Sequence, residues 1–143
     1  MTDPLENRKD AKTAKETREE IEEVGREVVD ASVTVHRALG PGLLESAYQA
    51  CLAHELRSRM LDVRCEVDLP VAYRGIEVSA GYRIDMLVND VVIVENKAVE
   101  QVLPIHTAQL LTYLRLADCR LGFLLNWCVP LMKDGITRLV NHL

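Results

Sequence analysis

The chain lacks the segments and pairings that mark membrane, secreted and disulfide-held proteins. No apolar run among its 143 residues approaches the roughly 20 residues that a transmembrane helix needs. The N-terminal stretch MTDPLENRKDAK contains no hydrophobic segment of the kind found in signal peptides. The four cysteines are widely spaced among apolar neighbours and form no C-x-x-C pair, which is typical of reduced core residues and argues against a zinc knuckle. These absences predict a cytoplasmic protein that does not enter a membrane.

Turn-forming residues and excess positive charge are also scarce. With seven glycines, five prolines and 48% hydrophobic residues, the chain suits one globular domain with a substantial core. Its 17 Lys and Arg residues against 22 Asp and Glu residues give a net charge of −5, which argues against binding nucleic acid by bulk charge alone. Most of the acidic excess lies in residues 1–30, and the rest of the chain is nearly neutral. A local basic patch is compatible with this distribution.

Hydrophobic periodicity divides the chain into a charged N-terminal extension, residues 1–20, and one domain, residues 21–143. The extension has no apolar periodicity that could dock it, so we expect a solvated helix or disorder there. In the domain, apolar residues recur every three or four positions over 21–39, and GPG at 40–42 ends that helix. Further elements are expected in the order of a helix over 43–60, strands with tight turns over 63–97, a helix over 104–116 and two strands. This order predicts an α/β fold.

One expected strand, VVIVENKAV at 91–99, carries charge inside an otherwise apolar run. Glu95 and Lys97 share one face about 6.6 Å apart, because side chains alternate along a strand, and Asn96 points to the other face. Burying an unpaired charge costs several kcal/mol, so both charges need partners. An ion pair between Glu95 and Lys97, or a strand end that has reached solvent, would explain them without any function.

Asp85 adds a second carboxylate, because a turn at Asn89-Asp90 would return the chain and bring Glu95 near it. A two-residue loop would put the two carboxylates on opposite faces, so a shared site requires a three-residue loop, 88–90 or 89–91, or a β-bulge. Two close carboxylates repel unless a proton or a cation intervenes, and magnesium prefers carboxylate oxygens. A lysine beside such an ion can hold an attacking water or offset phosphate charge.

This pattern resembles the PD-(D/E)XK nuclease superfamily, and GLLESAY at 42–48 is similar to the G-x-x-E-x-x-Y signature of its GxxExxY branch. The stretches that carry the resemblance are VHRALGPGLLESAY, GYRIDMLV, VIVENKAVE and HTAQLLTYLRL, from about residue 33 to the C-terminus. The resemblance implies a restriction-endonuclease-like core, in which a mixed, mainly antiparallel sheet is flanked by helices. It also implies that Asp85 and Glu95 are metal ligands and that Lys97 is the catalytic lysine. Asn96 and Trp127 depart from the branch, which more often has an apolar residue and a phenylalanine there.

The same resemblance adds residues on two helices. Glu45 maps onto the helix glutamate of the family, as a further metal ligand, although a helix dipole alone would also favour a carboxylate in a first turn. Tyr48, three residues on, would face the same side and contact the substrate or support the ligands. Gln109 and Tyr113 map onto a Q-x-x-x-Y element that would orient the lysine or a phosphate, with His106 beside them. For Tyr113, a buried ring with a satisfied hydroxyl is the alternative.

The function expected from these residues is hydrolysis of nucleic-acid phosphodiester bonds, with DNA as the first candidate substrate and Mg²⁺ or Mn²⁺ as the cofactor. Two alternatives stay open. One is a non-catalytic nucleic-acid- or protein-binding module on the same fold, and the other is a metal-dependent enzyme acting on a small phosphate ester. A homo-oligomer is compatible with the sequence, which leaves open the choice of DNA or RNA and of exo or endo action.

Overall fold

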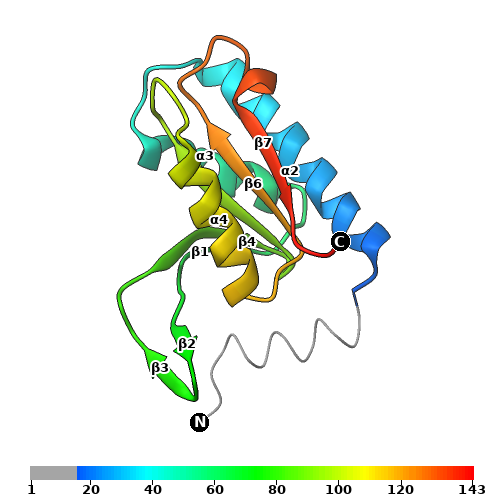
Figure 1. Ribbon diagram of the computed structural model, residues 1–143. Helices are drawn as coiled ribbons and strands as arrows, with labels where there is room; N and C mark the ends of the chain where they lie inside the picture. Colours follow the sequence, from blue (N-terminus) through cyan, green and yellow to red (C-terminus); the bar gives the residue numbers. More distant parts are fainter. Residues whose placement is uncertain (1–15) are drawn as a thin grey trace.

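A computed structural model describes residues 16–143 of the chain (Figure 1). In chain order its elements are α2 (Arg18–Leu39), α3 (Glu45–Ser58), β1 (Val63–Asp68), β2 (Val71–Tyr73), β3 (Ile76–Val78), β4 (Arg83–Val88), β5 (Val92–Lys97), α4 (Pro104–Leu116), β6 (Leu121–Asn126), the 3-10 helix η1 (Met132–Gly135) and β7 (Ile136–Val140). Five strands form a sheet in the order β1-β4-β5-β6-β7, and β2 pairs with β3 in a separate two-stranded sheet. All pairs are antiparallel except β5 with β6. The predicted α/β fold with a mixed, mainly antiparallel sheet is confirmed.

Helix α2 begins three residues before the expected start of the domain. The Thr17 hydroxyl accepts the Glu20 N–H at 3.2 Å, and the Thr17 N–H donates to the Glu20 carboxylate at 2.7 Å. This capping box satisfies amides that a helix start leaves unpaired. The first helix therefore runs across the expected boundary at residue 21, with Thr17 as its N-cap. The expectation for residues 1–15 lies outside the described residues.

Helices α3 and α4 start close to the predicted positions. Glu45 is the first residue of α3, and Pro104 occupies the first turn of α4, where its missing N–H costs no hydrogen bond. The α4 helix ends at Leu116, as predicted. None of the helices formed by residues 16–143 combines the length and the apolar character that a membrane span requires.

The hairpin of β4 and β5 sets the register on which the candidate site depends. Val88 pairs with Val92, which leaves a three-residue loop at 89–91, and the ladder continues to the pair of Met86 with Val94. Asn89 and Asp90 both adopt positive φ, 49° and 59°, a conformation that Asn and Asp tolerate better than most residues. The prediction of a three-residue loop is confirmed. Extending this register by one residue places Asp85 opposite Glu95 on one face.

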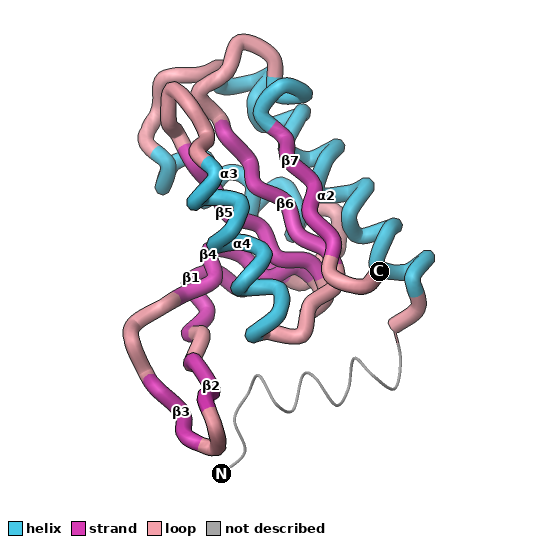
Figure 2. Tube along the Cα trace, viewed as in Figure 1, coloured by secondary structure: helices cyan, strands magenta, loops and turns pink. Residues whose placement is uncertain are grey.

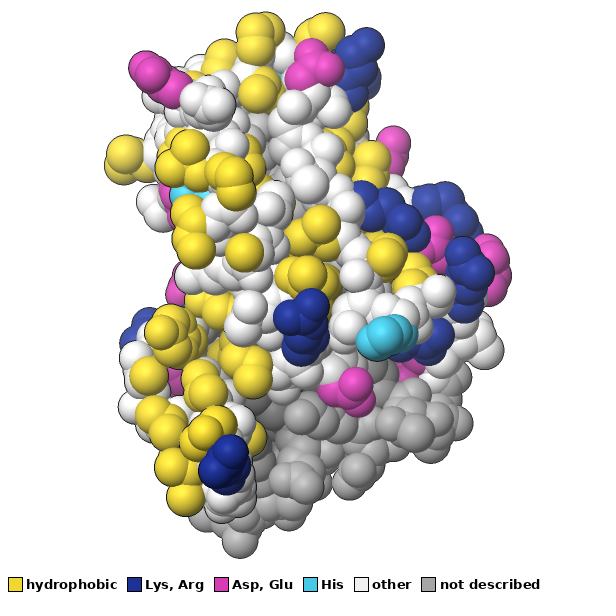
Figure 3. Space-filling model, in the orientation of Figure 1, with side chains coloured by type: hydrophobic (Ala, Val, Ile, Leu, Met, Phe, Trp, Pro, Cys, Tyr) yellow, Lys and Arg dark blue, Asp and Glu magenta, His cyan; other side chains and the backbone are white. Residues whose placement is uncertain are grey.

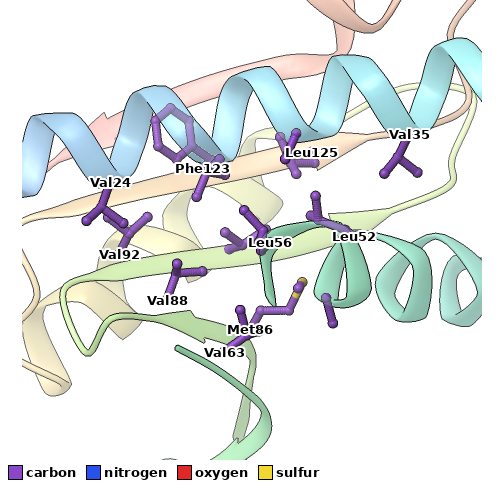
Figure 4. Packing of buried hydrophobic residues seen from close by; sticks show 14 of the residues in the cluster. Val24, Val35, Leu52, Leu56, Val63, Met86, Val88, Val92, Phe123 and Leu125 are labelled. Atoms are coloured by element: carbon purple, nitrogen blue, oxygen red, sulfur yellow. The ribbon is translucent and has the colours of Figure 1, made fainter. Parts of the chain in front are cut away.

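Helices cover both faces of the five-stranded sheet (Figures 1 and 2). Figure 4 shows apolar side chains of α2 and α3, among them Val24, Leu52 and Leu56, packed against side chains of the strands such as Met86 and Phe123. A second cluster lies under α4 on the opposite face. Each buried Val, Leu or Phe stabilises the fold by about 1.5–3 kcal/mol relative to exposure. The paired segments 86–88 of β4 and 92–94 of β5 are buried on both faces, and all of their residues are apolar.

Strands β2 and β3 form an arm that stands off the end of β1 and β4 (Figures 1 and 2). We call residues 71–78 the arm. Its large side chains are exposed, with Tyr73 and Ile76 both 59% accessible. An isolated two-stranded hairpin is marginally stable in water, so this exposed apolar surface is unusual for a purely structural element.

Candidate active site

Asp85 and Glu95 lie where β4 and β5 separate. Beyond the Met86–Val94 pair the backbone ladder stops, and the two carboxylates take its place as acceptors. The Asp85 N–H donates to Glu95 Oε2 at 2.7 Å, and the Asn96 N–H donates to Asp85 Oδ2 at 2.9 Å. From here β5 continues beside β6, while β4 stays beside β1. The two candidate ligands therefore fill the fork between diverging strands, on one face as predicted.

Both carboxyl groups bind protons more tightly than usual. Burial is the main cause at each group: it raises the pKa of Glu95 to about 8 and that of Asp85 to about 6. The charge of Asp85 adds to the rise at Glu95, whereas the backbone N–H bonds and the charge of Lys97 lower both pKa values. Two ionised groups at this fork would repel, which is the situation that a bound cation relieves.

Lys97 lies two residues beyond Glu95 on the same strand, and therefore on the same face. Its charge lowers the pKa of both carboxyl groups, so the ammonium lies in their neighbourhood. Among residues 16–143, however, no Asp or Glu oxygen approaches Lys97 within 4.0 Å. The alternative of a contact ion pair between Glu95 and Lys97 is not what the structure shows.

A pocket of about 670 Å³ lies between the start of α3 and the strands beneath it, and Asp85 and Glu45 both line it. Glu45 is exposed, and its charge contributes to the raised pKa of Asp85. Within residues 16–143 no three His, Cys, Asp or Glu side chains are arranged to hold a metal ion together. Glu45 thus lies beside the fork without completing a three-carboxylate cluster, and its role as a metal ligand stays a prediction.

Glu66 is a site residue that the sequence did not reveal. It occupies the β1 position opposite Asp85, between the Cys65–Met86 and Val67–Ile84 pairs, and has a positive φ of 54°. Its charge raises the pKa of Asp85 and of Glu95, and it lines the same pocket. In the sequence Glu66 is one of several alternating polar residues of a strand, and only the pairing of β1 with β4 places it at the fork.

Three side-chain hydrogen bonds link Glu66 to the core. Trp127 Nε1–H donates to Asn96 Oδ1 at 2.9 Å, Asn96 Nδ2 donates to Gln49 Oε1 at 3.3 Å, and Gln49 Nε2 donates to Glu66 Oε1 at 2.9 Å. Asn96 and Trp127 are fully buried, so the indole belongs to the core. Asn96 does point to the face opposite Glu95, and the indole satisfies its carbonyl there. The two residues that differ from the pattern of the GxxExxY branch, Asn96 and Trp127, are therefore hydrogen-bonded to each other.

The polar residues of α4 are only partly associated with the fork. Gln109 Nε2 donates to the Tyr113 hydroxyl at 3.0 Å, so these two side chains form a pair as their spacing predicted. Burial, and then the charge of Glu95, raise the pKa of Tyr113, which places its ring near the carboxylates. His106 Nδ1 accepts the Leu103 N–H at 3.0 Å and closes the first turn of the helix. A helix-closing contact therefore accounts for His106, and its predicted role toward a phosphate stays untested.

Tyr48 does not share a surface with Glu45, contrary to the sequence-based expectation. Its ring is fully buried and stacks on Trp127, with centroids 4.8 Å apart and planes at 7°. Its hydroxyl donates to the Gly40 carbonyl at 2.5 Å and accepts the Leu43 N–H at 3.1 Å. Tyr48 therefore ties down the loop that precedes Glu45 and cannot contact a substrate from this position.

The donor set at the fork suits a hard divalent cation. Asp85 and Glu95 each use one oxygen to accept a backbone N–H, and no donor within residues 16–143 reaches the second oxygen of either group. Two carboxylate oxygens with water in the remaining positions match the preference of Mg²⁺. Burial, the main cause of the raised pKa values, disfavours the ionised carboxylates, and a bound cation would favour them. The residues present therefore fit a metal ion.

Comparison with known proteins gives one result. A family model described as the PD-(D/E)XK nuclease superfamily matches residues 22–139, from the first turns of α2 into β7. The matched span includes every candidate residue discussed above. Comparison with curated proteins and with solved structures gave no match.

Proposed function

The chain belongs to the PD-(D/E)XK nuclease superfamily, and we propose on this basis that it is a metal-dependent nuclease that hydrolyses nucleic-acid phosphodiester bonds, DNA in the first place. The mixed sheet flanked by helices is the restriction-endonuclease-like fold of that superfamily. The observation that carries the proposal is the fork, where the buried Glu95 and the half-buried Asp85, both with raised pKa values, lie beside a lysine that forms no contact ion pair with any of residues 16–143. The G-x-x-E-x-x-Y motif at 42–48 supports membership in the GxxExxY branch.

Nucleases of this superfamily generally use divalent metal ions. In this chain Asp85 and Glu95 would hold the ion, with Glu45 and Glu66 close enough to bind its outer waters. When bound, Mg²⁺ or Mn²⁺ would polarise the phosphate and lower the pKa of a water. The pocket above Asp85 gives a phosphate access to this place.

Side chains of the protein would carry out the rest of the reaction. The Lys97 ammonium can donate hydrogen bonds to the attacking water and to a phosphate oxygen, and its charge offsets the negative charge that develops on the phosphoryl oxygens. Gln109 and Tyr113, held together by their hydrogen bond, stand on α4 near Glu95 and can orient that phosphate. Contacts of this kind address the backbone, so we expect little sequence selectivity.

The test is cleavage by the purified full chain of supercoiled plasmid, single-stranded DNA, RNA and small phosphate esters, with and without Mg²⁺ or Mn²⁺. We expect metal-dependent cleavage of at least one nucleic acid. Lys97→Ala should keep metal affinity, measured by calorimetry, and lose turnover by about 100-fold or more, because the lysine acts on water and phosphate and cannot ligate a cation. Lys133→Ala, on exposed η1, is the matched control and should behave as the wild type.

A second candidate is a binding module on the same fold. The net charge of −5 and the lack of a three-carboxylate cluster within residues 16–143 favour it. Such a module would bind nucleic acid or protein without turnover. Wild-type protein that binds a substrate but neither binds Mg²⁺ or Mn²⁺ at millimolar concentration nor cleaves would select this candidate. Turnover of a small phosphate ester alone would identify the third function considered from the sequence.

A further inference from the structure

A hollow runs along the outer edge of β1, between the body of the protein and the base of the arm. Its volume is about 920 Å³, larger than the pocket at Asp85. Strand β1 is an edge strand of the five-stranded sheet, so no further strand of that sheet closes this side. The charged residues that line the hollow are Arg57, Arg64, Glu66, Asp68, Glu77 and Arg83, and the phenol ring of Tyr82 lines it as well.

This hollow is continuous with the candidate active site. Arg57, Cys65 and Glu66 line both the hollow and the pocket that contains Asp85. Tyr82 provides a second connection, because its ring packs edge-on against Tyr113, with centroids 6.3 Å apart and planes at 62°. A chain-like ligand with one phosphate at the fork can therefore continue into the hollow along the protein surface.

Arg57 is the cation of the hollow that forms no ion pair with a carboxylate of residues 16–143. Arg64 forms an ion pair with Asp90, and Arg83 lies 3.6 Å from Asp68. The Arg57 guanidinium instead donates to the Val63 carbonyl at 2.8 Å, and in the part of the chain that the structure describes no Asp or Glu oxygen lies within 4.0 Å of it. This exposed arginine, which contacts the Val63 carbonyl and the Cys65 side chain, keeps its charge and has further N–H groups for a phosphate oxygen.

The arm and its base carry exposed aromatic side chains. Tyr82 is 46% accessible, and at the tip of the arm the Arg74 guanidinium lies over the Tyr73 ring, 5.5 Å from its centroid. Figure 3 shows hydrophobic side chains gathered over the arm at the lower left, with a basic side chain among them. An exposed ring can stack on an unpaired base, whereas the bases of a duplex already stack on each other. One side chain that contacts a phosphate, next to a ring that can stack on a base, favours the binding of a single strand over a duplex.

We propose that the hollow binds the single-stranded nucleic acid that continues from the scissile phosphate, with Arg57 contacting a backbone phosphate and Tyr82 stacking on a base. The inference rests on the proposed nuclease function and names its substrate class, an unpaired strand. The acidic residues of the hollow restrict phosphate contact to Arg57. Binding in the hollow is therefore expected to depend more on base stacking than on charge.

The experiment measures fluorescence anisotropy of a labelled oligothymidylate and of a duplex of equal length, binding to the full-length Lys97→Ala variant in Mg²⁺. We expect the single strand to bind about 10-fold more tightly than the duplex. Tyr82→Leu should weaken single-strand binding about 10-fold, whereas Tyr82→Phe, which keeps the ring, should not change it. Arg57→Ala should weaken binding and reduce the slope of log K against log salt by about 0.7, the value for one phosphate on a single strand.

A charge-matched control separates the hollow from general electrostatics. Arg37 is exposed near the end of α2, which lies at the opposite end of the molecule from the arm (Figure 1), so Arg37→Ala should bind as the parent does. Each variant is checked for an unchanged melting temperature. Equal affinity for single strand and duplex, or binding that neither Tyr82→Leu nor Arg57→Ala alters, would overturn the proposal.

These outcomes differ from those that test the nuclease function. If wild type cleaves a nucleic acid but Tyr82→Leu and Arg57→Ala bind as the parent does, the nuclease proposal stands and the path along β1 is wrong. If wild type cleaves nothing while both variants lose single-strand binding, the hollow is a nucleic-acid site and the catalytic proposal fails.

Discussion

The indole N–H of Trp127 donates to the side-chain oxygen of Asn96 at 2.9 Å, and both side chains are fully buried. Asn96 stands between Glu95 and Lys97 on β5, so this bond fixes the strand that presents both residues. A buried amide without a partner costs about 1–3 kcal/mol, which makes the bond necessary once Asn96 is present. The pair therefore supports the fork from the face opposite the carboxylates.

The first prediction concerns this pair. Asn96→Leu leaves the indole N–H unpaired, and Trp127→Phe leaves the Asn96 oxygen unpaired, so each should lower the free energy of unfolding by about 1–3 kcal/mol. The double variant removes both polar groups and should be more stable than the sum of the single changes predicts, by about 0.5–3 kcal/mol. Urea denaturation of all four proteins measures this coupling. If the two single changes in the free energy of unfolding simply add up in the double variant, the bond does not contribute to stability.

The second prediction is a pH dependence of the metal-free protein. The unfolded chain has carboxyl pKa values near 4, whereas Asp85 and Glu95 reach about 6 and about 8 in the fold. Between these values the folded state holds more protons than the unfolded state, so the free energy of unfolding should fall as pH rises from about 5 to about 8. Mg²⁺ should reduce the fall, because it stabilises the ionised pair. Stability of the metal-free protein that rises over this range would contradict the raised pKa values.

The third prediction distinguishes a metal site from a structural network. Asp85→Asn keeps an oxygen that can accept the Asn96 N–H but removes one of two repelling charges, so it should keep or raise the stability of the metal-free protein and abolish metal binding. In a structural ion-pair network the same change would destabilise the fold by about 1–3 kcal/mol. Melting curves with and without Mn²⁺ decide between the two signs. Asp68→Asn, an exposed aspartate of β1, is the control and should change neither quantity.

The fourth prediction concerns the start of the domain. Thr17→Ala removes the acceptor for the Glu20 N–H and should lower the free energy of unfolding by about 1 kcal/mol. Thr17→Ser keeps the hydroxyl and should cost little. The measurement is urea denaturation in parallel with wild type. No difference between the alanine and serine variants would mean that this helix end frays in solution.

Simple periodicity was enough to predict the central part of the site. Side chains alternate along a strand, and a shared face for Asp85 and Glu95 requires an odd loop, which the structure has at 89–91. Glu66 could not be found in this way, because its place depends on which strand pairs with β4 and on a positive φ that no glycine signals. The predicted position of Tyr48 was wrong. Spacing along a helix predicts on which side of the helix a side chain lies, but not whether neighbouring parts of the core cover that side chain.

The bond between Tyr48 and the Gly40 carbonyl offers a structural reason for the spacing of the G-x-x-E-x-x-Y motif. The tyrosine reaches back from the second turn of α3 and holds both the Gly40 carbonyl and the Leu43 N–H. Glycine at 42, with φ 108°, lets the backbone double back within that reach. The length of one phenol side chain thus sets the distance between Tyr48, the last residue of the motif, and Leu43, its second residue. A residue inserted between them would displace Glu45 without changing the identity of any predicted metal ligand.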